Sequence, residues 1–180
     1  MKAKDQIHIL LVDDEPNVLK SLARLLRAYH ITEALSGEDA LQLLQEHSFD
    51  LIISDFRMPG IDGITFLCES LKIQPDAIRI ILTGHADLNN VIAAINEANV
   101  YRFITKPWDG PEVTHAVESG LAHQMVLQEN RQLANQVREQ QKQLDEKNAI
   151  LAALEKEEPG ITHVDWAEDG SIIINEDDYD

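Results

Sequence analysis

The sequence lacks cysteine pairs and long apolar runs. Its single cysteine, Cys68, excludes an intramolecular disulfide. No apolar stretch approaches the roughly 18 residues that cross a bilayer, and no secretory leader pattern opens the chain. We therefore expect a cytoplasmic protein that does not associate with a membrane.

Basic residues are also scarce. The 15 Lys and Arg residues face 32 Asp and Glu residues, which gives a formal net charge of −17. Proteins that bind nucleic acid neutralise its phosphates with clustered Lys and Arg. We therefore expect no nucleic acid among the direct partners of this chain.

Short apolar runs alternate with helical patterns from residue 7 to about residue 120. The strand-like runs are 7–12, 30–35, 50–54, 78–82 and 101–105, and the helical patterns are 16–28, 38–47, 62–73, 87–97 and 110 onward. This alternation predicts an α/β fold in which helices cover both faces of a doubly wound five-stranded parallel sheet. The first and third strands would lie side by side at the switch point of that sheet.

Polar residues follow four of these strands. Asp13 and Asp14 follow the first strand, Asp55 the third, Thr83 the fourth and Lys106 the fifth. The carboxyl ends of parallel strands share one edge, where open α/β sheets bind ligands. Three carboxylates would repel one another without a divalent cation, whereas the lysine and the hydroxyl suit an anion. We therefore predict phosphoryl chemistry at Asp55.

Mg²⁺ is the cofactor that this set of oxygen atoms favours. Asp14, Asp55 and the backbone carbonyl of Arg57 would bind it directly, and Asp13 through water. Asp55 would then stay ionised, with its second oxygen atom able to attack phosphorus. Each motif taken singly also fits a helix cap, a turn, a loop start or an ordinary bend.

The combined motifs resemble the receiver domain of bacterial two-component response regulators over residues 6–120. The matching segments are Leu11-Val12-Asp13-Asp14-Glu15-Pro16, Ser54-Asp55-Phe56-Arg57-Met58-Pro59-Gly60, Leu82-Thr83-Gly84-His85 and Thr105-Lys106-Pro107-Trp108. The resemblance implies a flavodoxin-like fold that accepts a phosphoryl group on Asp55 from the phosphohistidine of a sensor histidine kinase. Such a domain catalyses only its own phosphorylation and dephosphorylation.

The resemblance also implies roles for individual residues. It places Mg²⁺ at Asp13, Asp14 and Asp55, puts phosphate contacts on Thr83 and Lys106, and makes the Lys106–Pro107 peptide bond cis. Thr83 and Phe103 would form the switch pair, although a phenylalanine offers no hydroxyl group there. Arg57 and His85 occupy positions that vary in the family, and we hypothesise that they control access of water to phosphorylated Asp55; simple surface side chains are the alternative.

A long helix with a heptad pattern follows over residues 121–158, where the sequence has no Pro or Gly. Its seam positions alternate in steps of four and three: Val126, Asn130, Leu133, Val137, Gln140, Leu144, Lys147, Leu151 and Leu154. This spacing predicts a coiled coil, most simply a homodimer, and a solvated single helix is the alternative.

The last segment, residues 159–180, predicts a small β-hairpin around Asp169-Gly170 and an acidic tail. One hypothesis for the output is a dimer switched by phosphorylation through the helix and hairpin, rather than DNA binding. A second is an adaptor that grips a separate effector protein. A third, a Mg²⁺-dependent phosphatase with Asp55 as nucleophile, is disfavoured because Arg57 occupies the place of a second Asp.

Overall fold

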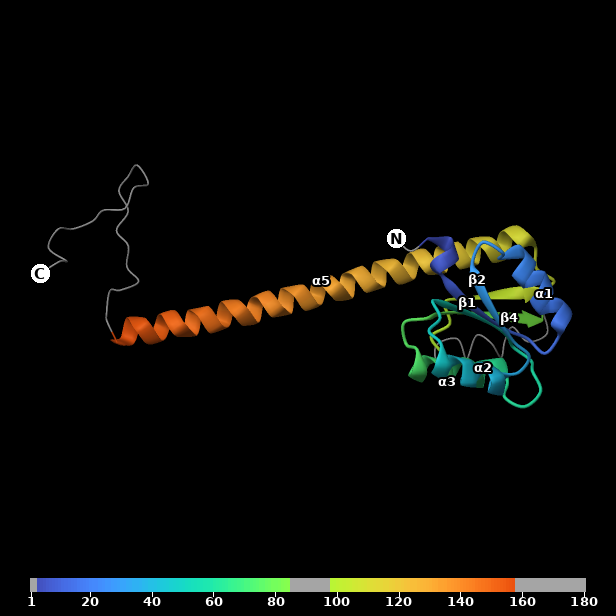
Figure 1. The fold of residues 1–180 in the computed structure, drawn as a ribbon, viewed down its shortest axis with the longest axis horizontal. Helices are drawn as coiled ribbons and strands as arrows, with labels where there is room; N and C mark the ends of the chain where they lie inside the picture. The colour runs from blue at the N-terminus through green and yellow to red at the C-terminus, as the bar shows by residue number, and fades with distance from the viewer. Residues whose placement is uncertain (1–2, 85–97, 158–180) are drawn as a thin grey trace, which may run out of the picture. The chain divides into compact units, whose positions relative to one another are not determined.

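The computed structural model describes residues 3–84 and 98–157 (Figure 1). Its strands are β1 (His8–Val12), β2 (His30–Ala34), β3 (Leu51–Asp55), β4 (Ile78–Gly84) and β5 (Arg102–Lys106), and its helices are η1 (Lys4–Gln6), α1 (Pro16–Leu25), α2 (Gly37–Glu46), α3 (Gly63–Ile73) and α5 (Gly110–Glu157). The predicted helix over 87–97, His85 and the predicted hairpin lie outside these residues. Within the described residues, no helix is long and apolar enough to cross a membrane.

The five strands form one parallel sheet in the order β2-β1-β3-β4-β5. This order confirms the predicted doubly wound α/β fold, in which β1 and β3 are neighbours at the switch point. The observed strands differ from the predicted ranges by one or two residues at their ends. Three polar residues that were expected just after their strands, Asp55, Thr83 and Lys106, still pair within β3, β4 and β5. Asp55 and Lys106 are the last residues of β3 and β5.

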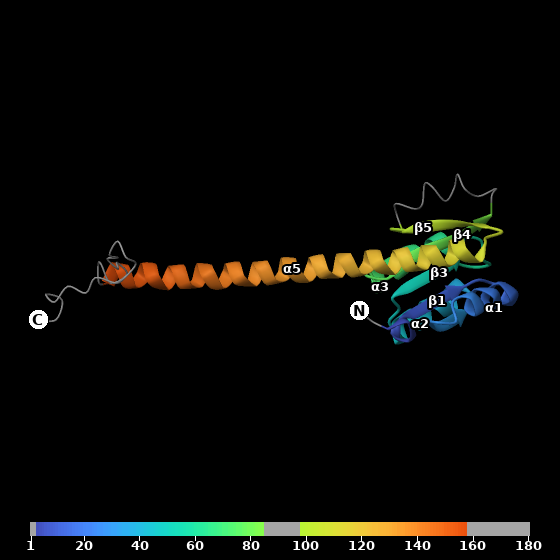
Figure 2. The same ribbon diagram turned by 90° about the horizontal axis from the view of Figure 1, so that it is seen from above.

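Each face of the sheet buries its own apolar cluster. Successive strand residues point to opposite faces, so Ile9 and Leu11 join the cluster under α1 and α5, whereas Leu10 and Val12 join the cluster under α2 and α3. Figure 1 shows α2 and α3 together on one side of the sheet, and Figure 2 shows α5 crossing in front of the strands. Two covered faces explain why the central strands are continuous apolar runs.

A buried arginine connects β4 to the end of α3. Arg79 is almost wholly buried, and its guanidinium donates hydrogen bonds to Ser70 Oγ (3.0 Å), Ser70 O (3.2 Å), Ala77 O (2.7 Å) and Gln74 O (2.5 Å). Burial lowers the pKa of Arg79 to about 10, so the side chain remains charged at neutral pH. It therefore supplies donors to carbonyl groups at and just after the end of α3, two of which, Ser70 O and Gln74 O, also accept from the backbone amides of Gln74 and Ala77.

Helix α5 packs on the sheet through a stripe that continues past residue 120. The buried residues of the stripe are Val113, Ala116, Val117, Gly120, Leu121 and Gln124. Gly120 lies close against the sheet, because a Cβ atom there would come within 2.9 Å of Ile78 Cγ2. The Gln124 amide donates to the carbonyl oxygens of Asp50 (3.2 Å) and Asp76 (2.8 Å), just before β3 and β4.

The chain divides into two compact units, residues 1–128 and 129–180. The described part of the second unit is the continuation of α5 to Glu157, and its residues are exposed apart from the half-buried Glu155. The predicted long helix after the sheet is therefore confirmed.

Candidate functional site

The sequence-predicted polar residues lie at the carboxyl ends of four neighbouring strands. Asp13 directly follows β1, Asp55 ends β3, Thr83 is the second-to-last residue of β4 and Lys106 ends β5. The strand register pairs Val12 with Ser54, Asp55 with Leu82, and Gly84 with Lys106. The parallel pairing thereby brings residues that are 93 positions apart in the sequence to one edge of the sheet.

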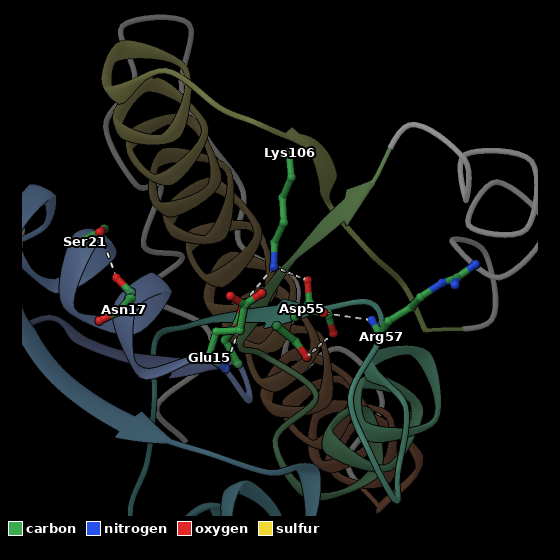
Figure 3. Close-up of polar contacts among 8 residues, drawn as sticks. Glu15, Asn17, Ser21, Asp55, Arg57 and Lys106 are labelled. Carbon is green, nitrogen blue, oxygen red and sulfur yellow. Dashed lines mark hydrogen bonds and ion pairs between the residues drawn. The ribbon is translucent and has the colours of Figure 1, made fainter.

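Lys106 joins two of the carboxylates. Its Nζ atom lies 2.9 Å from Asp13 Oδ2 and 2.6 Å from Asp55 Oδ1 (Figure 3). Asp13 is fully buried and Asp55 nearly so, whereas the Lys106 side chain is about a quarter exposed. An ammonium group held between two buried carboxylates is the central feature of the site.

Backbone amides hold the remaining carboxylate oxygens. Asp13 Oδ1 accepts a hydrogen bond from the amide of Glu15 (2.8 Å), and Asp55 Oδ2 accepts one from the amide of Arg57 (2.9 Å). Both donors lie two residues after the carboxylate that they bind, as in Asx turns. These bonds fix each carboxylate against its own loop, and the sequence alone gave no signal for the Glu15 amide.

The pKa of the Asp55 carboxyl is raised overall, because burial outweighs the effect of the cation beside it. Burial raises the pKa of the Asp55 carboxyl, Lys106 lowers this pKa, and the negative charge of Asp13 raises it again. Burial alone would lower the pKa of the Lys106 ammonium, but hydrogen bonds to Asp55 and Asp13 outweigh burial and raise it. The cation therefore stays protonated, and the paired acids favour additional positive charge nearby.

Other predicted residues lie around this ion pair in different ways. Thr83 is buried, and its hydroxyl group donates to Gly84 O (3.2 Å). Asp14 is exposed, and Phe103 on β5 is 39% exposed. In Figure 3 the Arg57 side chain extends away from the Asp55 carboxylate, although its backbone amide contacts that carboxylate.

The backbone next to Asp55 is closely packed against α3. A Cβ atom on Gly63 would come within 1.9 Å of Asp55 O, and the Gly63 amide donates to Phe56 O (3.0 Å). On the far side of the site, the Lys106–Pro107 peptide bond is cis, as the resemblance implied. The Lys106 ammonium lies 5.9 Å above the ring of the half-buried Trp108. The site therefore requires a residue without a side chain at position 63, which the sequence pattern did not indicate.

The donor atoms of the site suit a hard cation such as Mg²⁺. Asp13 and Asp55 present carboxylate oxygens within reach of one ammonium group, so both face the same point. Across 3–84 and 98–157, no three acidic, histidine or cysteine side chains converge as a metal-binding group. Mg²⁺ needs only one or two carboxylates because it keeps several water ligands. The residues present therefore fit a magnesium ion that also binds water.

Comparisons with known proteins agree with this geometry. A family described as the response regulator receiver domain matches residues 9–118. The transcriptional regulatory protein GlrR of Escherichia coli is 39% identical over 116 residues, which are 63% of this chain and 26% of that protein. The hydrogenase transcriptional regulatory protein HoxA of Cupriavidus necator is 36% identical over 104 residues, 57% of this chain and 22% of that protein. The chain thus spans about a quarter of the length of these curated relatives.

Solved structures give the same result. The signal receiver domain of an HD domain-containing protein from Pseudomonas fluorescens Pf-5 has a TM-score of 0.64 and 39% identity, covering 67% of this chain and 98% of that one. A response regulator receiver domain protein from Clostridium thermocellum has a TM-score of 0.64 and 32% identity, with the same coverage. The family match over residues 9–118 covers more than half of the chain and extends from β1 to β5. This chain therefore belongs to the response regulator receiver domain family of two-component signalling proteins.

Proposed function

We propose that Asp55 is the phosphoacceptor of this receiver and takes its phosphoryl group from the phosphohistidine of a sensor histidine kinase. The observation that carries the proposal is the contact of the Lys106 ammonium with both Asp13 and Asp55 at the carboxyl edge of the sheet. This arrangement holds a carboxylate nucleophile beside a cation that can neutralise the negative charge of a phosphoryl group bound to it. A purely structural ion pair would not require exposed residues beside it, whereas Asp14 and Arg57, in the loops after β1 and β3, are both exposed.

The transfer forms one bond and breaks another. An Asp55 carboxylate oxygen attacks phosphorus, the phosphorus–nitrogen bond to the imidazole breaks, and the imidazole keeps the electron pair and takes up a proton. Lys106 would neutralise charge on a phosphoryl oxygen, and the Thr83 hydroxyl would donate to another. Asp13, Asp14, Asp55 and the Arg57 carbonyl would hold magnesium, which would supply further charge neutralisation and orientation.

Phosphorylation by a small donor tests this proposal directly. The chain incubated with acetyl phosphate and Mg²⁺ is expected to gain the mass of one phosphoryl group, and chelation of Mg²⁺ should abolish the gain. Asp55→Asn should remove it, whereas Asp39→Asn, an exposed acid in the first turn of α2, should leave it intact. Labelling of Asp55→Asn equal to that of the natural chain would refute the assignment.

The role of Lys106 has its own test. Lys106→Met removes the cation that contacts Asp55, so phosphorylation by acetyl phosphate is expected to slow by about 10²-fold, the effect of losing one charge-stabilising donor. Lys72→Met removes an exposed cation on α3, which pairs with Glu69, and should leave the rate unchanged. Equal rates for the two variants would show that Lys106 has only a structural function.

We further propose that the three sequence segments have separate roles: residues 6–120 receive the phosphoryl group, and residues 121–158 and 159–180 carry the output. The output we favour is a change in pairing of the α5 helices of two copies, rather than DNA binding. The relatives GlrR and HoxA are named transcriptional regulators, but this chain matches only about a quarter of their length. In support of pairing, the apolar seam residues of α5 are exposed in the single chain.

The oligomeric state tests the proposed output. Sedimentation equilibrium with and without beryllofluoride and Mg²⁺ is expected to show a dimer whose mass, shape or dissociation constant depends on the phosphate mimic. A monomer under both conditions would refute pairing through α5. A dimer with identical shape and affinity in both states would refute its control by phosphorylation.

A further inference from the structure

The extension of α5 carries an apolar stripe that the rest of the described chain does not cover. Six large apolar residues of the heptad seam are between 42% and 63% exposed: Val126, Leu133, Val137, Leu144, Leu151 and Leu154. Gln124, only two residues before the seam begins, is buried against the sheet. Because two residues turn a helix by about 200°, Val126 lies on the side of α5 away from that contact.

We propose that a second copy of this chain covers the stripe as a parallel, two-stranded coiled coil in which each seam residue faces the same residue of the other copy. The proposal rests on the pairing output suggested above and specifies its orientation and register. A parallel pair attaches both receivers to the same end of the coiled coil.

The charge of the extension favours a second copy as the partner. Residues 129–157 contain five basic and six acidic residues, a net charge of −1 in a chain whose total is −17. Residues 1–128 contain 10 basic and 18 acidic residues, and residues 158–180 contain eight acidic residues and no basic ones. The helix is thus the part of the chain that two copies can bring together with little repulsion.

The polar seam residues favour the parallel orientation. Parallel, in-register helices set Asn130 opposite Asn130 and Gln140 opposite Gln140 of the second copy, so that each amide has both a donor and an acceptor facing it. A single Asn in such a seam fixes register and a two-stranded state. All six apolar layers then also match apolar with apolar.

Antiparallel registers match the same residues poorly. If Asn130 of one copy faces Gln140 of the other, the two seams overlap only over residues 126–144. Leu151 and Leu154 then have no apolar partners. Setting Asn130 opposite Lys147 instead places Gln140 against Val137 in two layers, which buries amides that have no partner. Neither alternative satisfies both the apolar and the polar positions.

Lys147 is the one seam residue that a parallel pair does not favour, because two ammonium groups share its layer. The long stems of the two side chains can carry both charges outward to solvent while their methylene groups cover the seam. Repulsion between exposed ammonium groups is weak in water and is further screened by salt. Dimer formation is therefore expected to strengthen as the salt concentration rises.

Disulfide cross-linking distinguishes the orientations. In the full chain with Cys68→Ser, Leu151→Cys is expected to oxidise to a cross-linked dimer, because the two residues at 151 face each other only in the parallel pair. Ala153→Cys is the matched control, since residue 153 lies about 200° around the helix from residue 151. In an antiparallel pair the residues at position 151 would be tens of ångströms apart, too far for a disulfide.

Each outcome decides the proposal. Complete conversion of Leu151→Cys to the doubled mass under oxidising conditions, with Ala153→Cys remaining a single chain, supports it. Cross-linking of Leu151→Cys only when it is mixed with Val126→Cys overturns the orientation, and a monomeric mass by sedimentation overturns pairing altogether. Phosphorylation at Asp55, measured by mass on the same samples, shows separately whether the proposed receiver function survives.

Discussion

The amide of Gln124 should contribute strongly to the stability of the receiver. It donates two hydrogen bonds, to the carbonyl oxygens of Asp50 and Asp76, from a side chain that is 7% exposed. Each bond contributes about 1 kcal/mol, and burial of the side-chain methylene groups adds about 1 kcal/mol. Gln124→Ala is therefore expected to lower the free energy of unfolding by about 3 kcal/mol.

Urea denaturation followed by far-UV circular dichroism, at one protein concentration, measures this loss. A slope of about 1–3 kcal/mol per molar urea converts it into a midpoint lower by about 1 to 3 M. Gln128→Ala is the matched control, because Gln128 is exposed one turn later on the same helix, and its expected change is below about 0.5 kcal/mol. Equal midpoints for the two variants would refute the reasoning. Phosphorylation of Asp55 should persist in Gln124→Ala, since Gln124 contacts the opposite ends of the strands.

Two further substitutions test buried contacts elsewhere. Arg79→Met removes four hydrogen bonds at the end of α3 and should cost about 3–5 kcal/mol of unfolding free energy, whereas the exposed Arg102→Met should cost less than about 0.5 kcal/mol by urea denaturation. Gly63→Ala drives a methyl group into Asp55 O and should cost about 1–3 kcal/mol and slow phosphorylation, whereas the Cβ of Gly110→Ala meets only a flexible Leu25 methyl at 3.2 Å. The role of Arg79 would be contradicted if Arg79→Met were as stable as its control. The role of Gly63 would be contradicted if Gly63→Ala were phosphorylated at the rate of the natural chain.

The sheet was predictable from local sequence because its strands are short β-branched and apolar runs bounded by polar residues. Apolar residues on both faces of the central strands indicated a sheet covered on both sides, and the alternation with helices indicated parallel pairing. The positions of Asp13, Asp55 and Lys106 followed from that topology alone. Their meeting was therefore foreseeable once the strand order was inferred, although the distances between their atoms were not.

Long-range polar contacts were not predictable. Arg79 lies inside an apolar strand run, and nothing in the sequence indicates that Ser70 and the end of α3 would satisfy its donors. Gln124 resembles the many exposed glutamines of the same helix and differs only because it faces the amino ends of β3 and β4. Such contacts depend on how separate elements pack, which local propensity and periodicity do not encode.

The anchoring of α5 by Gln124 has a consequence for grafting this receiver onto other proteins. A chimera joined at residue 118, where the family match ends, would keep Asp55 and Lys106 but discard Gly120, Leu121 and Gln124. Its acceptor would be assembled, yet the amino ends of β3 and β4 would lose the amide that covers them. To keep the stability of the native receiver, a chimera should therefore include the helix to a point beyond Gln124 before the foreign sequence begins.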